Sequence, residues 1–202
     1  MTNEQQHDTR YEASSGALAN QFLIAMPHLE DPWFNHTVTY LWRHNAEGAL
    51  GIVINKPSNL RLAELFGELQ ISVEARKGDI SFHSERVMSG GPVEKNKGFI
   101  LHSSEREWEY TLLITPQVSL TMSKDILVDI AAGNGPERYL VALGYASWEG
   151  GQLEQEIADN VWLTVPAIPE LIFSSDHPGK AEAAASILGL SLSQLSPTAG
   201  HS

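Results

Sequence analysis

Short apolar runs joined by links of only a few residues constrain the fold of this 202-residue chain more than any other feature. The runs Thr37–Trp42 and Leu50–Ile54 are rich in β-branched and aromatic residues, and the segment 43–48 between them carries Asn and Gly. This pattern predicts a hairpin, because these residue types favour strands and turns respectively. A parallel pair would need a crossover of roughly a dozen residues, so such short links favour an antiparallel or mixed sheet.

The same pattern recurs along most of the chain. Further strands are expected at Phe22–Met26, Arg86–Met88, Phe99–His102, Tyr110–Thr115, Val118–Thr121, Tyr139–Leu143 and Trp162–Val165. Helical spacing of apolar residues predicts helices around Leu62–Leu69, Ile126–Ile130, Leu153–Val161 and Ala181–Leu188. These short strands, with three or four helices among them in this order, indicate an α+β protein.

Helix boundaries follow from residues with capping chemistry. Ser58 or Asn59 is expected to cap the first helix and Ser123 the second, because these side chains accept hydrogen bonds from first-turn amides. Asp176 is expected to start the last helix, and Gly189 to end it.

The chain is expected to form one domain after a flexible N-terminal tail. Residues 1–17 contain almost no large apolar side chain except Tyr11, so they bury too little surface to offset the entropy of ordering. No shift in composition within residues 18–202 marks a linker, and no repeat is visible.

Charge and composition exclude several classes of function. With 13 basic and 25 acidic residues the net charge is −12, and the basic residues are scattered, which argues against direct nucleic-acid binding. Apolar runs such as Ala49–Ile54 are far shorter than the roughly 18 residues of a membrane span. The polar opening residues carry no export signal, so we expect a cytoplasmic protein with no membrane partner.

Motifs for cofactors and metals are missing from the sequence. The chain has no cysteine, which removes disulfides, thiolate zinc ligands and thiol nucleophiles. It has no Walker loop or Gly-x-Ser-x-Gly elbow, and residues 133–138 match only a fragment of a dinucleotide fingerprint. Neither a cofactor nor a metal is therefore expected.

Three places in the chain combine residues whose side chains could take part in binding or catalysis. His44 and Asn45 lie at the expected hairpin tip, with Asn55 at the far end of the next strand. Gly90 and Gly91 allow positive φ or close approach of another backbone. Each of these features also has a structural explanation, as turn residues or as a tight turn. The third place follows the expected strand 139–143.

The segment from Gly144 to Leu163 is the most unusual part of the sequence. It leads from a strand, through two glycines, into a helix whose first turns are acidic. The acids are suited to the positive end of the helix dipole. Alternatively, polar and aromatic residues of this segment line a small pocket. The candidates are Tyr145, Trp148, Glu149, Gln152, Glu156 and Asn160.

Read together, these segments resemble the YqgE/AlgH family. The matching pieces are FLIAMPHLEDPWF at 22–34, His44-Asn45 with Glu47-Gly48, GIVINKP at 51–57, GGPV at 90–93, GFILHS at 98–103, LTMSKDIL at 120–127, the 144–163 segment and Gly200-His201. The resemblance implies a bent, partly bifurcated sheet that closes into a pseudo-barrel. The best-known role of the family is that of a transcriptional regulator of alginate production. Where the family often has Cys-Glu, this chain has Trp42-Arg43, so no role can depend on that cysteine.

Two functional hypotheses follow. The first is a non-enzymatic regulatory or binding protein, which recognises a small molecule or a protein partner in a cleft built from the candidate residues above. The second is an enzyme that uses His44 or His102 as a base and Glu149 or Glu156 as an acid. The second hypothesis requires an imidazole and a carboxylate within hydrogen-bond reach of one pocket.

Overall fold

The computed structural model describes residues 14–73 and 84–195. The expected tail, residues 1–17, lies largely outside this range. Its last residues are described, and β1 (Ser14–Ser15) pairs in parallel with β3 at Arg43 and His44.

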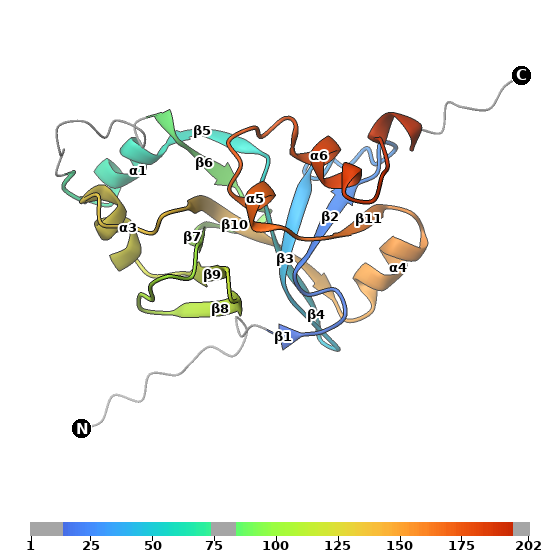
Figure 1. Cartoon of the computed structure of the whole chain (residues 1–202), viewed down its shortest axis with the longest axis horizontal. Helices are drawn as coiled ribbons and strands as arrows, with labels where there is room; N and C mark the ends of the chain where they lie inside the picture. The colour runs from blue at the N-terminus through green and yellow to red at the C-terminus, as the bar shows by residue number, and fades with distance from the viewer. Residues whose placement is uncertain (1–13, 74–83, 196–202) are drawn as a thin grey trace, which may run out of the picture.

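The strands form one curled sheet that divides at a shared strand, β10 (Figure 1). The main path runs β11-β2-β3-β4-β10-β7-β9-β8, and β5 and β6 join it through β10. The further strand bounds are β2 Gln21–Ala25, β3 Val38–Asn45, β4 Gly48–Val53, β5 Pro57–Arg61, β6 Arg86–Ser89, β7 Val93–His102, β8 Thr111–Thr115, β9 Val118–Thr121, β10 Tyr139–Glu149 and β11 Trp162–Pro166. The expected α+β fold with a bent, bifurcated and mostly antiparallel sheet is confirmed, as a half-barrel.

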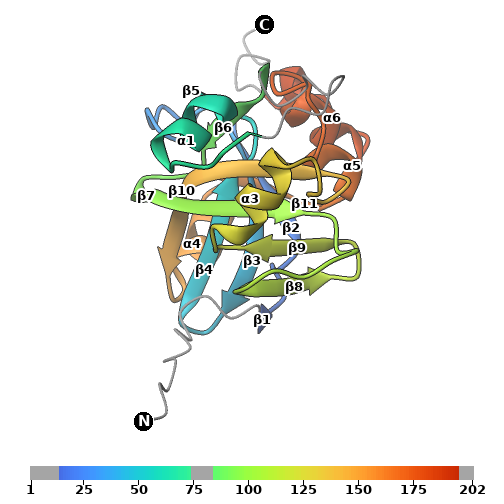
Figure 2. The same cartoon turned by 90° about the vertical axis from the view of Figure 1, so that its left-hand side faces the viewer.

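Strand β10 belongs to both halves of the sheet because it bends at Gly144, where φ is +75°. Before the bend it pairs with β7 and β6, and after it, from Ala146, with β4. Figure 2 shows the result, with β3 and β4 running across the direction of β7, β8 and β9. A left-handed φ is most easily adopted by glycine, which explains this residue at the bend.

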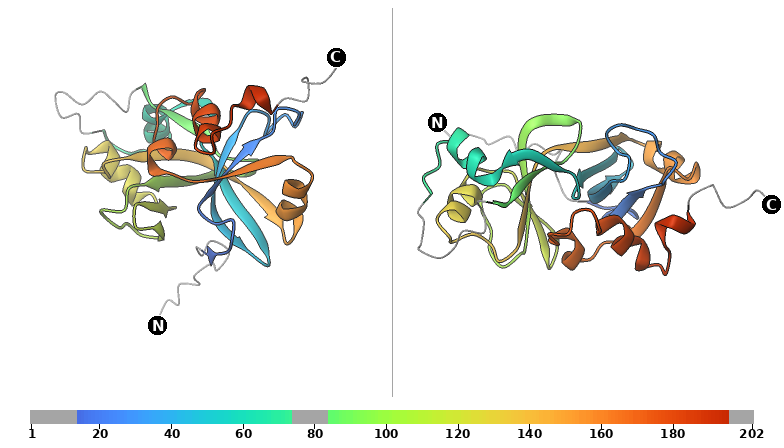
Figure 3. Two further views of the ribbon diagram at one scale, coloured as in Figure 1. Left: turned by 45° about the vertical axis from the view of Figure 1, so that its right-hand side comes forward. Right: turned by 90° about the horizontal axis from the view of Figure 1, so that it is seen from above.

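Apolar side chains fill three connected regions of the interior. The main core lies inside the curled sheet and includes Phe22, Trp42 and Phe99. A second cluster packs beneath the helices α1 (Leu62–Glu68) and α3 (Asp125–Ala131), and a third beneath α4 (Gln152–Ala158). In Figures 1 and 3, α1 and α3 lie at the end of the molecule opposite to α4.

Three further elements complete the described chain. They are α5 (Pro169–Ile172), α6 (Lys180–Ser186) and the 3-10 turn η2 (Leu192–Gln194). Figure 3 shows them together along one side of the half-barrel. Among the described residues, no helix has the length and apolar character that a bilayer crossing requires.

Several expected boundaries are wrong. Ser58 and Asn59 do not cap α1, because they lie within β5, and the N-cap residue is Arg61. Ser123 donates to Glu109 O and to Asp125 instead of accepting from an amide of α3. The last helix begins at Lys180 and not at Asp176, whose Oδ1 accepts a hydrogen bond from Gly179 N.

Candidate functional site

His44 holds three parts of the chain together at the end of the hairpin. Its Nδ1 accepts a hydrogen bond from Leu18 N at 3.4 Å, so the proton lies on Nε2. Nε2 donates to Glu154 Oε1 on α4 at 2.7 Å. His44 is thus paired with a carboxylate, although with neither of the expected acids, Glu149 and Glu156. With 8% of its surface exposed, the imidazole serves as a buried connection between the N-terminal segment, β3 and α4.

Glu156 is engaged by two indoles. Its Oε2 accepts hydrogen bonds from Trp148 Nε1 at 2.9 Å and Trp162 Nε1 at 2.7 Å. Its Oε1 accepts from Gln152 Nε2 at 2.9 Å. The two indole rings meet edge to face, with their centroids 5.9 Å apart, and Phe34 contacts both. The carboxylate therefore joins α4 to the ends of β10 and β11.

The other candidates near α4 have local structural roles. Asn45 Oδ1 accepts from Glu47 N in the hairpin turn, and Glu149 N donates to Gln152 Oε1 at the start of α4. Asn160 is exposed and has a φ of +58°, a conformation in which Asn often ends a helix. These contacts are local, and the hairpin tip meets the 144–163 segment where His44 contacts Glu154 and where β4 pairs with β10.

Gly90 and Gly91 allow two backbones to pack closely. A Cβ at Gly90 would lie 2.3 Å from Gly144 O, and one at Gly91 would lie 2.0 Å from the carbonyl carbon of Tyr145. Neither glycine has a positive φ, so close approach is the reason for this pair. The Tyr145 ring packs in the core against Trp42 and Phe99.

His102 is fully buried at the end of β7. Its Nδ1 donates to Ser103 O at 2.8 Å, and its Nε2 accepts from Thr121 Oγ1 at 2.8 Å. Burial lowers the pKa of His102, which favours this neutral form. The chain of hydrogen bonds continues from Thr121 to Thr111, whose Oγ1 accepts from Trp108 N.

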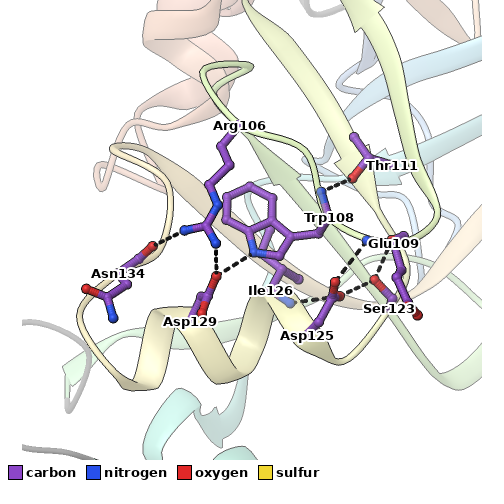
Figure 4. Close-up of polar contacts among 9 residues, drawn as sticks. All are labelled: Arg106, Trp108, Glu109, Thr111, Ser123, Asp125, Ile126, Asp129 and Asn134. Carbon is purple, nitrogen blue, oxygen red and sulfur yellow. Dashed lines mark hydrogen bonds and ion pairs between the residues drawn. The ribbon is translucent and has the colours of Figure 1, made fainter.

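Trp108 links the His102 region to α3, and Figure 4 shows its contact with Asp129 of that helix. Its ring lies edge to face with the His102 ring, with the two centroids 5.1 Å apart. Its Nε1 donates to Asp129 Oδ2 at 2.9 Å. The same carboxylate oxygen pairs with Arg106 at 2.8 Å, and Asp125 accepts from Glu109 N. These contacts fasten the loop between β7 and β8 to α3, so His102 belongs to a structural network.

A cavity of about 670 Å³ lies between the end of β4, the chain between β2 and β3, and α6. We call it the α6 cavity. Its walls are mostly apolar, with several polar groups and two oppositely charged residues. The lining residues are Ala25, Pro27, Asn35, His36, Thr37, Asn55, Lys56, Pro178, Ala181, Glu182, Leu192 and Ser193.

Asn55 is the one sequence-predicted candidate among the lining residues of the α6 cavity. Its Oδ1 accepts from Val38 N at 2.7 Å, and its Nδ2 donates to His36 O at 2.9 Å. Asn55 thereby fixes the chain around His36, which has a φ of +59°. Its amide shapes the cavity wall.

Lys180 lies buried beside the α6 cavity, with 1% of its surface exposed. Its Nζ donates to Ile54 O and Ile172 O, both at 2.9 Å. Burial lowers the pKa of Lys180 to about 7, although Asp176 acts in the opposite direction. The amine ties α6 to β4 and α5. Lys180 was not among the predicted site residues, although its position on the apolar face of α6, four residues before Ala184, is a signal visible in the sequence.

A second cavity, of about 400 Å³, is lined by residues of β6, of β10 and of the segment between α5 and α6. Glu85, Tyr139 and His177 are among its lining residues, and burial raises the pKa of Glu85. Among the described residues, no group of three or more His, Cys, Asp and Glu side chains could hold a metal ion.

These observations define a class of protein: an α+β half-barrel with a ligand-sized cavity beside α6, whose buried polar groups mainly serve the fold. The chain belongs to the AlgH-like family, DUF179, which it matches over residues 22–193. The family resemblance seen in the sequence is thereby confirmed.

Relatives and solved structures agree with this assignment. A UPF0301 protein of Pseudomonas entomophila is 47% identical over 184 residues, covering 91% of this chain and 95% of that protein. One from Marinomonas sp. is 46% identical over 182 residues, covering 90% and 95%. The solution structure of AlgH from Pseudomonas aeruginosa is 45% identical, with a TM-score of 0.74, and covers 95% of this chain and 100% of that chain. A Corynebacterium diphtheriae protein, at 16% identity and a TM-score of 0.63, shares the fold, over 86% of this chain and 90% of its own.

Proposed function

We propose that this chain is a binding protein that recognises a small molecule in the α6 cavity, and that it works without a catalytic step. The observation that carries the proposal is the cavity itself. Its volume of about 670 Å³ falls within the range of small-molecule sites, roughly 300–1,000 Å³. Apolar walls with a few convergent polar groups are typical of such sites.

The geometry of the two candidate bases, His44 and His102, argues against the acid–base chemistry expected of them and supports binding. Both ring nitrogens of His44 and of His102 are engaged by protein groups. Glu156 accepts from two indoles, and no hydrogen bond joins either histidine to Glu149 or Glu156 among the described residues. A general base must reach the proton that it removes, and these groups are committed elsewhere.

A regulatory role would then depend on whether a ligand occupies the cavity, or on a protein partner. The family resemblance suggests regulation of transcription as one such role. The acidic composition, with a net charge of −12, favours an indirect route over DNA contact. A role in transcriptional regulation would place the protein in the cytoplasm.

A thermal-shift screen with a metabolite library tests this function, because a ligand that binds only the folded state raises Tm. The variant Ser193→Trp places an indole at the cavity wall, and Gln117→Trp adds the same indole in the turn between β8 and β9. We expect hits whose shift is lost in Ser193→Trp and kept in Gln117→Trp. The proposal fails if saturating ligands leave Tm unchanged, or if every hit is insensitive to Ser193→Trp.

A further inference from the structure

Lys56 presents a fixed ammonium group at the wall of the α6 cavity. Its Nζ donates to Trp33 O at 2.8 Å and to Pro32 O at 3.2 Å. It also lies over the Trp33 ring, 4.7 Å from the centroid. These contacts orient the cation, yet all of them are to uncharged groups.

A second lysine shares the same indole. Lys95 Nζ lies 5.0 Å from the centroid of the Trp33 ring. We call Trp33, Lys56 and Lys95 the Trp33 cluster. It gathers two positive charges around one indole in a chain whose overall charge is −12, and its Lys56 is also a lining residue of the α6 cavity. The cluster is too small to follow a nucleic-acid backbone, but it suits a single anionic group.

No carboxylate neutralises the Trp33 cluster at close range. Within the part of the chain that the structure describes, no Asp or Glu oxygen lies within 4.0 Å of the Nζ of Lys56 or Lys95. Asp31 acts on Lys56 from farther away, and its Oδ1 accepts from Trp33 N and Phe34 N. Lys56 is half-buried, and this burial lowers its pKa.

The opposite wall of the cavity differs in character. Ala181 and Leu192 supply apolar surface, and Glu182 is the one acidic residue among the described lining. The Oε2 of Glu182 accepts from Leu192 N at 3.0 Å, so this carboxylate is held by η2. The cavity therefore has a cationic side at Lys56, just after β4, and a largely apolar side at α6.

We propose that the ligand of the α6 cavity is a small organic anion, with a carboxylate or phosphate bound by Lys56 and an apolar body packed against α6 and η2. This inference rests on the proposed function and adds the chemical class of the ligand. An anion would complete the coordination of Lys56 by a charge-assisted hydrogen bond, and would relieve the repulsion between Lys56 and Lys95.

The test uses three probes of similar size: benzoate, phenyl phosphate and benzamide. Each is titrated into ¹⁵N-labelled full-length protein while the Trp33 indole N–H and the Ala181 amide are followed by NMR. We expect at least one anion to bind about tenfold or more tightly than neutral benzamide, as loss of a charge-assisted contact predicts. The tighter of the two anions identifies the headgroup. Binding should weaken as salt is raised.

Lysine variants locate the anion. Lys56→Met should weaken binding of the anion about tenfold or more, and Lys56→Arg should restore much of it. Lys95→Met should also weaken binding, and it leaves the backbone contacts of Lys56 in place. Lys124→Met is the matched control, because Lys124 also donates to a backbone carbonyl, Leu69 O, but lies beside α3.

The outcomes separate this inference from the function on which it rests. If benzamide binds in the cavity as tightly as the anions, or if Lys56→Met and Lys124→Met behave alike, the anion inference is wrong while a binding function stands. If no probe perturbs Trp33 or Ala181, the anion inference is also wrong, and the library screen decides the binding function independently.

Discussion

Lys180 shows how a single side chain can tie several elements together at a cost that depends on pH. Its amine lies among apolar residues and donates to the carbonyls of Ile54 and Ile172. Asp176, which precedes α6, acts to raise its pKa, and Lys180 in turn lowers the pKa of His177. Its pKa of about 7 in the fold lies well below the ordinary value of 10.5.

This shift has a definite sign for stability. Between pH 7 and 10.5 the unfolded chain binds a proton at Lys180 that the folded chain does not, so stability rises with pH. The rise is at most about 1.4 kcal/mol per pH unit. Lys180→Met should lose this rise, and Lys124→Met should keep it. Urea midpoints from about pH 7 to 9.5 give the measurement, and parallel curves for wild type and Lys180→Met would contradict the expectation.

At the scale of elements, the fold depends on how closely the Gly90–Gly91 turn approaches β10. The backbone hydrogen bonds Gly90 N to Leu143 O and Val53 N to Gly90 O fix the turn between the two halves of the sheet. Side chains cannot be accommodated there, since the neighbouring atoms are backbone atoms of Gly144 and Tyr145.

Gly91→Ala should therefore lower the free energy of unfolding by about 3 kcal/mol or more, because its Cβ would meet the Tyr145 carbonyl group at 2.0 to 2.1 Å. Gly98→Ala on β7 is the control, since a Cβ there has no atom within 4 Å and should change stability by less than about 1 kcal/mol. Urea unfolding of both variants is the measurement. Equal midpoints would show that the turn can move away from β10.

The sequence predicted most strands because their apolar runs are local signals. It missed β5, Pro57–Arg61, whose residues alternate between exposed and partly buried and which forms only through pairing with β6. It also misjudged the extent of two strands: β7 includes the polar residues 94–97, and β10 continues beyond Gly144. Both extensions are held by partner strands that no local pattern reveals.

The sites were harder to predict than the fold. Histidines and acids drew attention as chemical groups, but His44, His102 and Glu156 owe their positions to buried hydrogen bonds with distant residues. The α6 cavity was not foreseen beyond Asn55, because its walls come from segments more than a hundred residues apart. Only the folded chain brings Lys56 and Ala181 together.

For the whole molecule, the balance of charge is the main constraint on partners. The chain carries 25 acidic and 13 basic residues, and the positive charge at the Trp33 cluster comes from two lysines. A duplex would meet a repulsive field over most of the surface.

We therefore expect no binding of a generic DNA duplex tighter than about 100 µM at physiological salt, the weak limit of non-specific association. Titration of labelled duplex at several salt concentrations, followed by fluorescence anisotropy, gives the measurement. Tight binding that weakens steeply with salt would overturn the indirect route to regulation.

The two halves of the sheet share β10, and this sharing limits where the chain can be divided into two fragments that still fold. A fragment ending before Tyr139 would lack the strand on which β4, β6 and β7 all depend, and a break at Gly144 would leave each piece with half of it. Separately expressed halves should therefore be recovered in folded form only when they are produced together and reassemble.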